Sequence, residues 1–270
     1  MTQRVSPVIV LPGAIGYAPD LTMSGDVTRF EVIGYPGWPR YFAKGFSVGT
    51  LIAGLADQIE IRVPQGPICI LGVSIGGHLG YAAALDLQAR GREIGGFCAI
   101  DTFMVSSAAP SRGWLARAIS LGSALISNRR FDEFARFLRA RFWRALLRLA
   151  GDRLPALFRR HVASGRLPFF VAFDPLFTEE LNMRLLIRHV APWIPSLDRE
   201  PVSLLAPTVL LRTQSIASDD PAWCRRCPNI NVIELSGDHQ TVFTPENVGL
   251  LRKFFIADNV QKLASCARSK

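Results

Sequence analysis

The sequence of 270 residues predicts an α/β protein with a mostly parallel sheet, flanked by helices and interrupted by a helical insertion. Short apolar runs lie between turn residues, and stretches with helical periodicity separate some of them. The expected strands are residues 8–11, 29–33, 68–73, 96–100, 208–212 and 231–235, and the expected helices are residues 46–63 and 77–90. The runs are apolar almost throughout, which is typical of strands buried on both faces of a parallel sheet.

The strand rhythm stops for about a hundred residues after residue 101, far longer than an ordinary connection. This stretch has a helical pattern, and we expect it to form a lid over the carboxyl ends of the strands, where open α/β sheets bind ligands. The sequence therefore predicts two domains: an α/β core of residues 1–104 and 201–270, and a helical, arginine-rich lid of residues 105–200.

The net charge of +9 is concentrated in that insertion. Residues 111–170 hold thirteen Arg, no Lys and three acids, a local charge of +10, whereas the other 210 residues carry −1. Within it Leu138, Phe142 and Leu149 share one helical face with arginines elsewhere. This pattern fits either a solvated lid face or a surface for an acidic partner. A binding module for membrane surface or nucleic acid on an inactive scaffold is the third, less favoured interpretation.

Targeting and cysteine patterns favour a cytoplasmic protein. The sequence holds no run of about 18 apolar residues, so we expect no stable membrane insertion, and we expect no nucleic-acid partner. Five scattered cysteines do not make a disulfide framework, which favours a reducing compartment. Cys224 and Cys227 lack a second ligand pair nearby, so we expect no metal site.

The stretch from Gly72 to Gly77 contains the candidate nucleophile, Ser74. It follows an apolar run and precedes a helix, so Ser74 would occupy a tight strand-to-helix turn that the flanking glycines permit. The amide of Ile75 at the start of that helix could donate to a developing oxyanion. A second donor is expected from the loop after the first strand, where the amide of Ala14 is best placed.

A serine nucleophile needs a base and an acid that orients it. Of the four histidines, His239 lies just past the last expected strand, on the loop where such a fold needs its base. The strand-to-helix turn at Ser74 is called the elbow below. Asp101 ends the strand that follows this elbow, whereas Asp219 and Asp220 follow the next expected strand. Either position preserves the chain order Ser, Asp, His, so the residues alone do not decide which of these aspartates is the acid.

With these residues assembled, the chain resembles the thioesterase domains of nonribosomal peptide and polyketide synthases, a branch of the α/β-hydrolases. The resemblance rests on Gln65-Gly66-Pro67 before the elbow strand, the elbow from Gly72 to Gly77, Ile100-Asp101, and Gly237-Asp238-His239, with further similarity in residues 12–17 and at Trp223. It covers most of the chain except the lid. It implies the α/β-hydrolase fold, Ser74 as the acylated nucleophile, Asp101 as the preferred acid and His239 as the base.

The resemblance also implies the reaction and the partner. We expect a serine hydrolase that cleaves a peptidyl or polyketide thioester through an acyl-enzyme, with release by hydrolysis or cyclisation. The substrate would arrive on the 4'-phosphopantetheine arm of an acyl or peptidyl carrier protein, and no cofactor of its own is expected. A carboxylester hydrolase or lipase acting on small esters is the alternative. The apolar residues Phe103, Phe170, Phe173 and Phe177 are the candidates to line an acyl pocket, although core packing explains them as well.

Overall fold

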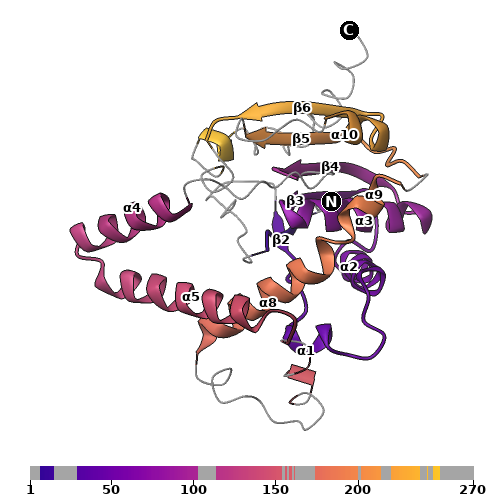
Figure 1. The fold of residues 1–270 in the computed structure, drawn as a ribbon. Helices are drawn as coiled ribbons and strands as arrows, with labels where there is room; N and C mark the ends of the chain where they lie inside the picture. Colours follow the sequence, from indigo (N-terminus) through magenta and orange to yellow (C-terminus); the bar gives the residue numbers. More distant parts are fainter. Residues whose placement is uncertain are drawn as a thin grey trace. The chain divides into compact units, whose positions relative to one another are not determined.

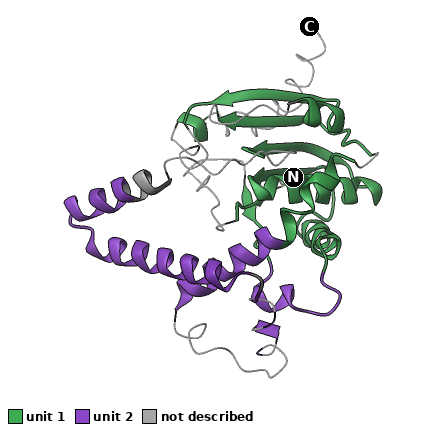
Figure 2. Cartoon of the chain, viewed as in Figure 1, with its two compact units in different colours: residues 1–35, 47–106, 189–270 green, residues 36–46, 107–188 purple. Residues whose placement is uncertain are grey.

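The computed structural model describes part of the chain, and that part forms two compact units. The described residues are 7–14, 29–102, 114–153, 156, 158–159, 161, 174–199, 202–213, 220–237, 242 and 246–249, with only the backbone described for 114–118, 121, 152 and 220. Unit 1 comprises residues 1–35, 47–106 and 189–270, and unit 2 comprises residues 36–46 and 107–188 (Figure 2). The domain boundaries after residues 104 and 200, and the placement of a lid over the sheet, stay predictions.

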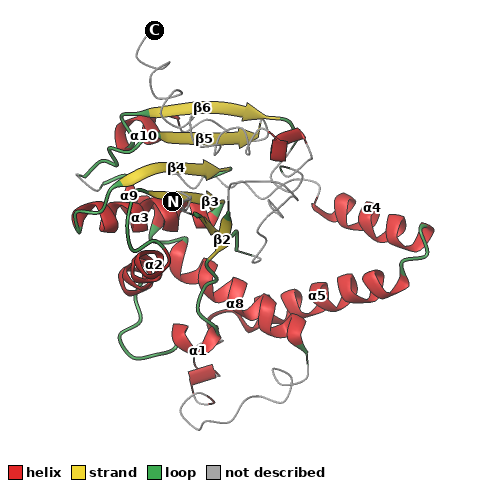
Figure 3. Cartoon of the chain, turned by 180° about the vertical axis from the view of Figure 1, so that it is seen from behind, coloured by secondary structure: helices red, strands yellow, loops and turns green. Residues whose placement is uncertain are grey.

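Unit 1 is built on a parallel sheet of six strands among the described residues (Figure 1). The strands are β1 (Val8–Leu11), β2 (Phe30–Val32), β3 (Ile68–Val73), β4 (Ile94–Ile100), β5 (Thr208–Thr213) and β6 (Ile230–Leu235). Their order is β2-β1-β3-β4-β5-β6, and every neighbouring pair is parallel. The predicted fold class is confirmed, because β3 and β4 occupy the middle of a parallel sheet with helices packed against it (Figure 3).

The predicted elements of unit 1 are confirmed with small shifts at their ends. The strand expected at 96–100 begins two residues earlier, at Ile94, which pairs with Ile68 of β3. The helix expected at 77–90 begins at Ile75, directly after the elbow. The helix expected at 46–63 is α2 (Val48–Arg62), because Ser47 and Thr50 form a reciprocal cap at its first turn.

Both faces of the sheet are buried. Leu71 of β3 and Cys98 of β4 pair on one face, and their neighbours Ile70 and Phe97 pair on the other, all at most 1% exposed. Phe97 contacts aromatic rings of two helices, Tyr81 of α3 (Ile75–Ala89) and Trp223 of α10 (Asp220–Arg226). Strands covered on both sides need apolar residues at successive positions, which explains the continuous apolar runs in the sequence.

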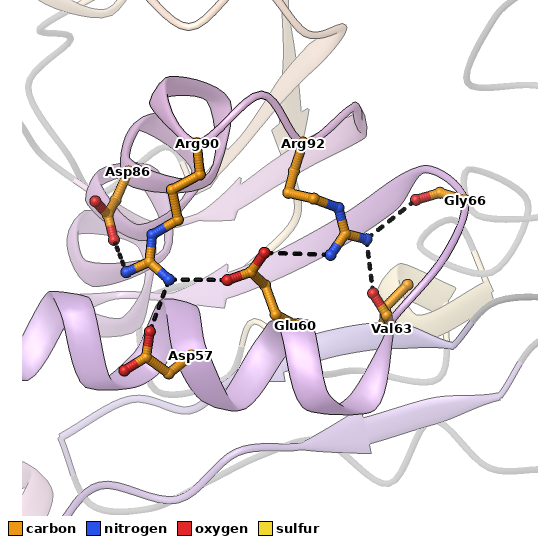
Figure 4. A network of polar contacts seen from close by, with 7 residues as sticks. All are labelled: Asp57, Glu60, Val63, Gly66, Asp86, Arg90 and Arg92. Atoms are coloured by element: carbon orange, nitrogen blue, oxygen red, sulfur yellow. Dashed lines mark hydrogen bonds and ion pairs between the residues drawn. The ribbon is translucent and has the colours of Figure 1, made fainter.

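An ionic network joins the ends of α2 and α3 on the surface of unit 1 (Figure 4). The guanidinium of Arg90 bonds to Asp57, Glu60 and Asp86 at 2.6–2.8 Å. Arg92 reaches Glu60 and donates to the carbonyls of Val63 and Gly66, where α2 leads into β3. Because one guanidinium has several donors, these two arginines connect the ends of α2 and α3 to each other and to the loop that leads into β3.

Unit 2 consists of helices and their connections. Its described elements are α1 (Trp38–Tyr41), α4 (Trp114–Ser127), α5 (Phe131–Ala150), the 3₁₀ turn Gly151–Arg153 and most of α8 (Pro175–Val190), and the short α9 (Ile194–Leu197) follows α8 in unit 1. The helices α5 and α8 are joined by aromatic and ionic contacts. Trp143 packs edge-on against Phe177 at 4.9 Å between ring centroids, and its Nε1 donates to Asp174 at 2.6 Å. Arg139 bonds to Asp174 at 2.9 Å, and Arg144 pairs with Glu180.

The apolar stripe of α5 is largely exposed to solvent. Leu138, Phe142 and Leu149 of the apolar stripe are 50%, 60% and 84% exposed. Arg139 and Arg144, by contrast, pair with the carboxylates of Asp174, directly before α8, and of Glu180 within α8. Among the described residues, no helix combines the length and apolar content that crossing a membrane requires.

Candidate active site

Ser74 sits on a strained turn between β3 and α3. Its backbone has φ 53° and ψ −118°, a region that costs a non-glycine residue roughly 1–3 kcal/mol. The turn is held by main-chain hydrogen bonds: the N–H of Ser74 donates to Ile100 O at 2.8 Å, and its carbonyl accepts from Gly77 N–H at 2.9 Å. The strain is retained because the surrounding sheet and helix fix both sides of the turn, which is the geometry of a nucleophile elbow.

The glycines after Ser74 are required by close packing. A Cβ at Gly76 would overlap the main-chain oxygen of Leu11 and lie 2.5 Å from that of Pro12, where β1 ends. A Cβ at Gly77 would overlap the side chain of Thr102, beyond the end of β4. The first turn of α3 therefore touches the ends of both strands that flank β3. These contacts explain why the elbow pattern needs glycine at both positions.

Asp101 follows the strand next to the elbow. Val73 of β3 pairs with Ile100 of β4, and these are the last residues of the two strands. Ser74 and Asp101 are therefore the first residues after neighbouring strand ends. Asp101 also has a positive φ of 46° and is only 1% exposed. Its carboxylate accepts the N–H of Thr213 at 2.7 Å on Oδ1 and the hydroxyl of Thr213 at 3.0 Å on Oδ2. The sheet thus places two of the three expected triad residues at the carboxyl ends of its central strands.

A second set of bonds fixes the backbone between these residues. The hydroxyl of Thr102 lies 3.1 Å from the carbonyls of both Ser74 and Ile100, and can donate to either. The indole of Trp223, which is fully buried in α10, donates to Thr102 O at 2.9 Å. Thr102 and Trp223 therefore connect the turn at Ser74 to the end of β4, where Asp101 lies.

The loop that contains Ala14, one of the two expected oxyanion donors, passes close to the end of β3. Ala14 follows Gly13, and a Cβ at Gly13 would lie 3.8 Å from the carbonyl of Val73, the last residue of β3. The carbonyl of Pro12 accepts the hydroxyl of Tyr35 at 2.6 Å, which holds the start of this loop. Ile75, the second expected donor, is the first residue of α3, and N–H groups at that position have no partner within the helix. Their joint role as an oxyanion hole stays a prediction.

Several predicted site residues fall outside the described part of the chain. They are His239, Phe103, Phe170, Phe173 and Asp219, together with the side chain of Asp220. Their roles stay predictions. Phe177 is described: it is 1% exposed in unit 2, where it contacts the rings of Trp143 and Phe158.

Asn247 joins the chain on either side of the segment that contains His239. Its side-chain amide donates to Ser236 O at 2.9 Å and to Val242 O at 2.8 Å, and Asn247 is 4% exposed. Together with Thr102 and Thr213, this residue is one that the sequence reasoning missed. Thr213 and Thr102 reach partners 112 and 28 residues away, and the bonds of Asn247 span 5 and 11 residues, so no local pattern marks these residues.

Four of the five cysteines lie in the described part of the chain. Cys69, Cys98, Cys224 and Cys227 are free, and within the described residues no three His, Cys, Asp or Glu side chains are grouped to hold a metal. Burial raises the pKa of Cys227 to about 12, so this thiol stays protonated at neutral pH. A buried, protonated cysteine next to an exposed one is a poor metal-ligand pair.

The parallel sheet and the strained serine turn define a protein with the α/β-hydrolase fold, and the comparisons with known proteins agree. The thioesterase-domain family model matches residues 21–138. Comparison with curated proteins finds no significant match.

Solved structures resemble nearly the whole chain. A crystal structure of the NocB thioesterase domain, in covalent complex with a fluorophosphonate nocardicin G analogue, aligns with TM-score 0.54 and 15% identity over 97% of this chain and 95% of its own. The Vlm2 thioesterase domain bound with a dodecadepsipeptide aligns with TM-score 0.51 and 18% identity over 93% of this chain and 92% of its own. The four-domain nonribosomal peptide synthetase AB3403 aligns with TM-score 0.52 and 18% identity over 91% of this chain and 19% of its own. The resemblance to such thioesterase domains is thus confirmed, and at these identities the structures establish the fold.

Proposed function

We propose that the protein is a serine thioesterase that releases a peptidyl or polyketide acyl group from a phosphopantetheine thioester. The observation that carries this proposal is the strained Ser74 at the end of β3, beside Asp101 at the end of β4. Non-glycine residues with a positive φ cluster at active sites, and two of them, Ser74 and Asp101, follow the carboxyl ends of neighbouring strands here. The thioesterase-domain match supports the choice of a thioester over a simple ester.

In the proposed mechanism, His239 takes the proton of the Ser74 hydroxyl as its oxygen attacks the thioester carbonyl. Asp101 accepts the other imidazole N–H and stabilises the imidazolium that forms. The amides of Ala14 and Ile75 donate to the tetrahedral oxyanion. The intermediate collapses, the C–S bond breaks, and the imidazolium gives its proton to the leaving thiolate. Water or an internal nucleophile of the acyl chain then attacks the acyl-enzyme, with His239 again as the base, and restores Ser74.

The proposed partner is an acyl or peptidyl carrier protein, which presents the substrate in the cytoplasm. The Vlm2 domain is bound with a depsipeptide, so a peptidyl chain is a reasonable acyl class to test first. The insertion offers cations to an acidic partner: Arg136 and Arg148 are exposed and form no ion pair within the described residues. Arg139 and Arg144 are already paired inside unit 2, so they contribute less to steering.

The central experiment is intact-mass spectrometry after incubation with acyl-pantetheine thioesters and a serine-directed fluorophosphonate. The wild-type protein should gain one adduct, and Ser74→Ala should gain none while turnover falls roughly 10⁴-fold or more. Circular dichroism of both proteins controls for folding. An adduct on folded Ser74→Ala would overturn the assignment of the nucleophile. Faster turnover of small soluble esters than of any thioester would favour the carboxylester hydrolase instead.

Carrier recognition is tested separately. The double variant Arg136→Ala, Arg148→Ala should lower kcat/KM for a carrier-bound thioester and leave that for a free pantetheine thioester unchanged. Added salt should lower the wild-type value for the carrier-bound substrate more than that of the variant, because screening weakens long-range steering. Equal salt sensitivity of the two proteins would contradict a role for these arginines.

A further inference from the structure

Thr213, on the neighbouring strand β5, holds both oxygens of the Asp101 carboxylate. The backbone N–H of Thr213 donates to Oδ1 at 2.7 Å, and its hydroxyl donates to Oδ2 at 3.0 Å, so both oxygens are engaged. Asp101 is 1% exposed and Thr213 is fully buried. Each carboxylate oxygen can accept more than one hydrogen bond, so this contact still leaves acceptor positions for another group.

The backbone geometry explains why the carboxylate lies there. The N–H of Asp101 donates to Leu211 O at 2.8 Å, as in a regular parallel ladder between β4 and β5. The next rung of that ladder would run from the N–H of Thr213 to the main-chain oxygen of Asp101. Asp101 instead turns out of the strand with φ 46°, and its side-chain Oδ1 accepts that N–H. The carboxylate therefore occupies a backbone position in the sheet.

This arrangement bears directly on what a triad acid must do. The acid orients the base by keeping one oxygen aimed at an imidazole N–H, yet the terminal torsion of an aspartate is broad and roughly two-fold. The N–H of Thr213 fixes one oxygen, and its hydroxyl fixes the other, so rotation about this torsion is removed. We infer that Thr213 is a positioning residue for the proposed reaction and acts through Asp101. This inference rests on the proposed function.

A second buried threonine on the same strand provides the comparison. Thr208, at the start of β5, is 1% exposed, and its hydroxyl donates to the backbone carbonyl of Ala206 at 3.1 Å. Thr208 thus has the burial and the strand of Thr213 without the carboxylate. Replacement of either threonine by valine removes a buried hydroxyl at nearly constant volume. A merely structural role predicts similar consequences at the two positions.

The test compares Thr213→Val, Thr213→Ser and Thr208→Val by steady-state kinetics on an acyl-pantetheine thioester. Thr213→Val should lower kcat by about 10- to 100-fold, the effect expected for a lost hydrogen bond to a charged group, with KM nearly unchanged. Thr213→Ser should restore most of kcat, and Thr208→Val should leave it unchanged. Thermal denaturation of each variant monitors folding. If Thr213→Val does not fold, Thr213→Ala removes the same hydroxyl with less bulk.

A double-mutant comparison separates this inference from the proposed function. In an Asp101→Asn background, Thr213→Val should cause no further loss of kcat, because the group it positions is already gone. Equal losses from Thr213→Val in both backgrounds would overturn the inference. So would full activity of Thr213→Val beside an inactive Asp101→Asn protein, with the proposed function intact. Full activity of Asp101→Asn would show that the proposed acid is wrong, and the inference would fall with it.

Discussion

In unit 1 the buried carboxylate of Asp101 accepts hydrogen bonds from the neutral donors of Thr213, whereas in unit 2 the carboxylates of Asp174 and Glu180 bond to arginines. Neutral donors fix the direction of a carboxylate and leave its negative charge in place. An arginine partner cancels the charge as well, and so makes the carboxylate part of the packing. On the proposed function, the carboxylate in unit 1 stabilises a cationic intermediate, whereas the carboxylates in unit 2 stabilise the packing of helices.

The largest effect should come from removing the charge in unit 1. Asp101→Asn should lower kcat roughly 10⁴-fold, as expected for a triad acid, because the amide no longer stabilises an imidazolium. Asp174→Asn, a matched change in unit 2, should leave kcat nearly unchanged. The measurement is steady-state turnover of an acyl-pantetheine thioester. A severe loss in Asp219→Asn or Asp220→Asn with an active Asp101→Asn would move the acid to the loop after β5.

A backbone contact should give the next largest effect. Gly76→Ala places a methyl against the main-chain oxygens of Leu11 and Pro12, which cannot rotate away, so the free energy of unfolding should fall by about 3 kcal/mol or more. Gly80→Ala is the control in the same helix. Its Cβ would lie 3.3–3.4 Å from side chains of Ile70, Phe97 and Leu11, which can adjust. Urea denaturation compares the two, and equal stabilities would contradict the close approach at the elbow.

Within unit 2, breaking the pair of Arg144 and Glu180 should destabilise without affecting chemistry. Glu180 is buried and Arg144 is about one-third exposed, so the cost of Glu180→Gln is discounted for solvent to about 1–3 kcal/mol. Arg136→Gln, at an exposed position with no ion pair among the described residues, should change stability by less than about 0.5 kcal/mol. Denaturant titration measures both. A similar small effect for the two variants would show that the pair is merely a surface contact.

The smallest effect should be a pH dependence of unit 2. Burial acts to raise the pKa of Asp174, but hydrogen bonds from Trp143, Arg139 and the Leu176 N–H outweigh it and leave the pKa below its usual value. A lowered folded-state pKa stabilises the protein above the unfolded pKa of about 4, and this stability is lost as pH falls through the folded value. The stability difference between wild type and Asp174→Asn should therefore shrink below about pH 4. A difference that is constant with pH would contradict the prediction.

The same contrast explains what could be predicted from the sequence. Strands buried on both faces give continuous apolar runs, and the elbow needs glycines at fixed spacing, so the sheet, Ser74 and Asp101 as an acid candidate could be identified from local patterns. Thr213 could not, because its partner lies 112 residues away and only the strand order brings them together. The partners of the α5 arginines could not be predicted either, because Asp174 and Glu180 lie 35 and 36 residues from Arg139 and Arg144, which pair with them.

The position of Asp101 also has a consequence for how the protein is made. The chain leaves the sheet after β4 and returns only at β5, so the strands that hold Ser74 leave the ribosome well before the residue that fixes Asp101. Contacts so distant in sequence form late, because the intervening loop must first be closed. A nascent chain that ends within the insertion would carry the nucleophile without the carboxylate clamp. On the proposed function, which also needs His239 after β6, hydrolytic activity therefore appears only when synthesis has passed both the clamp on β5 and this base.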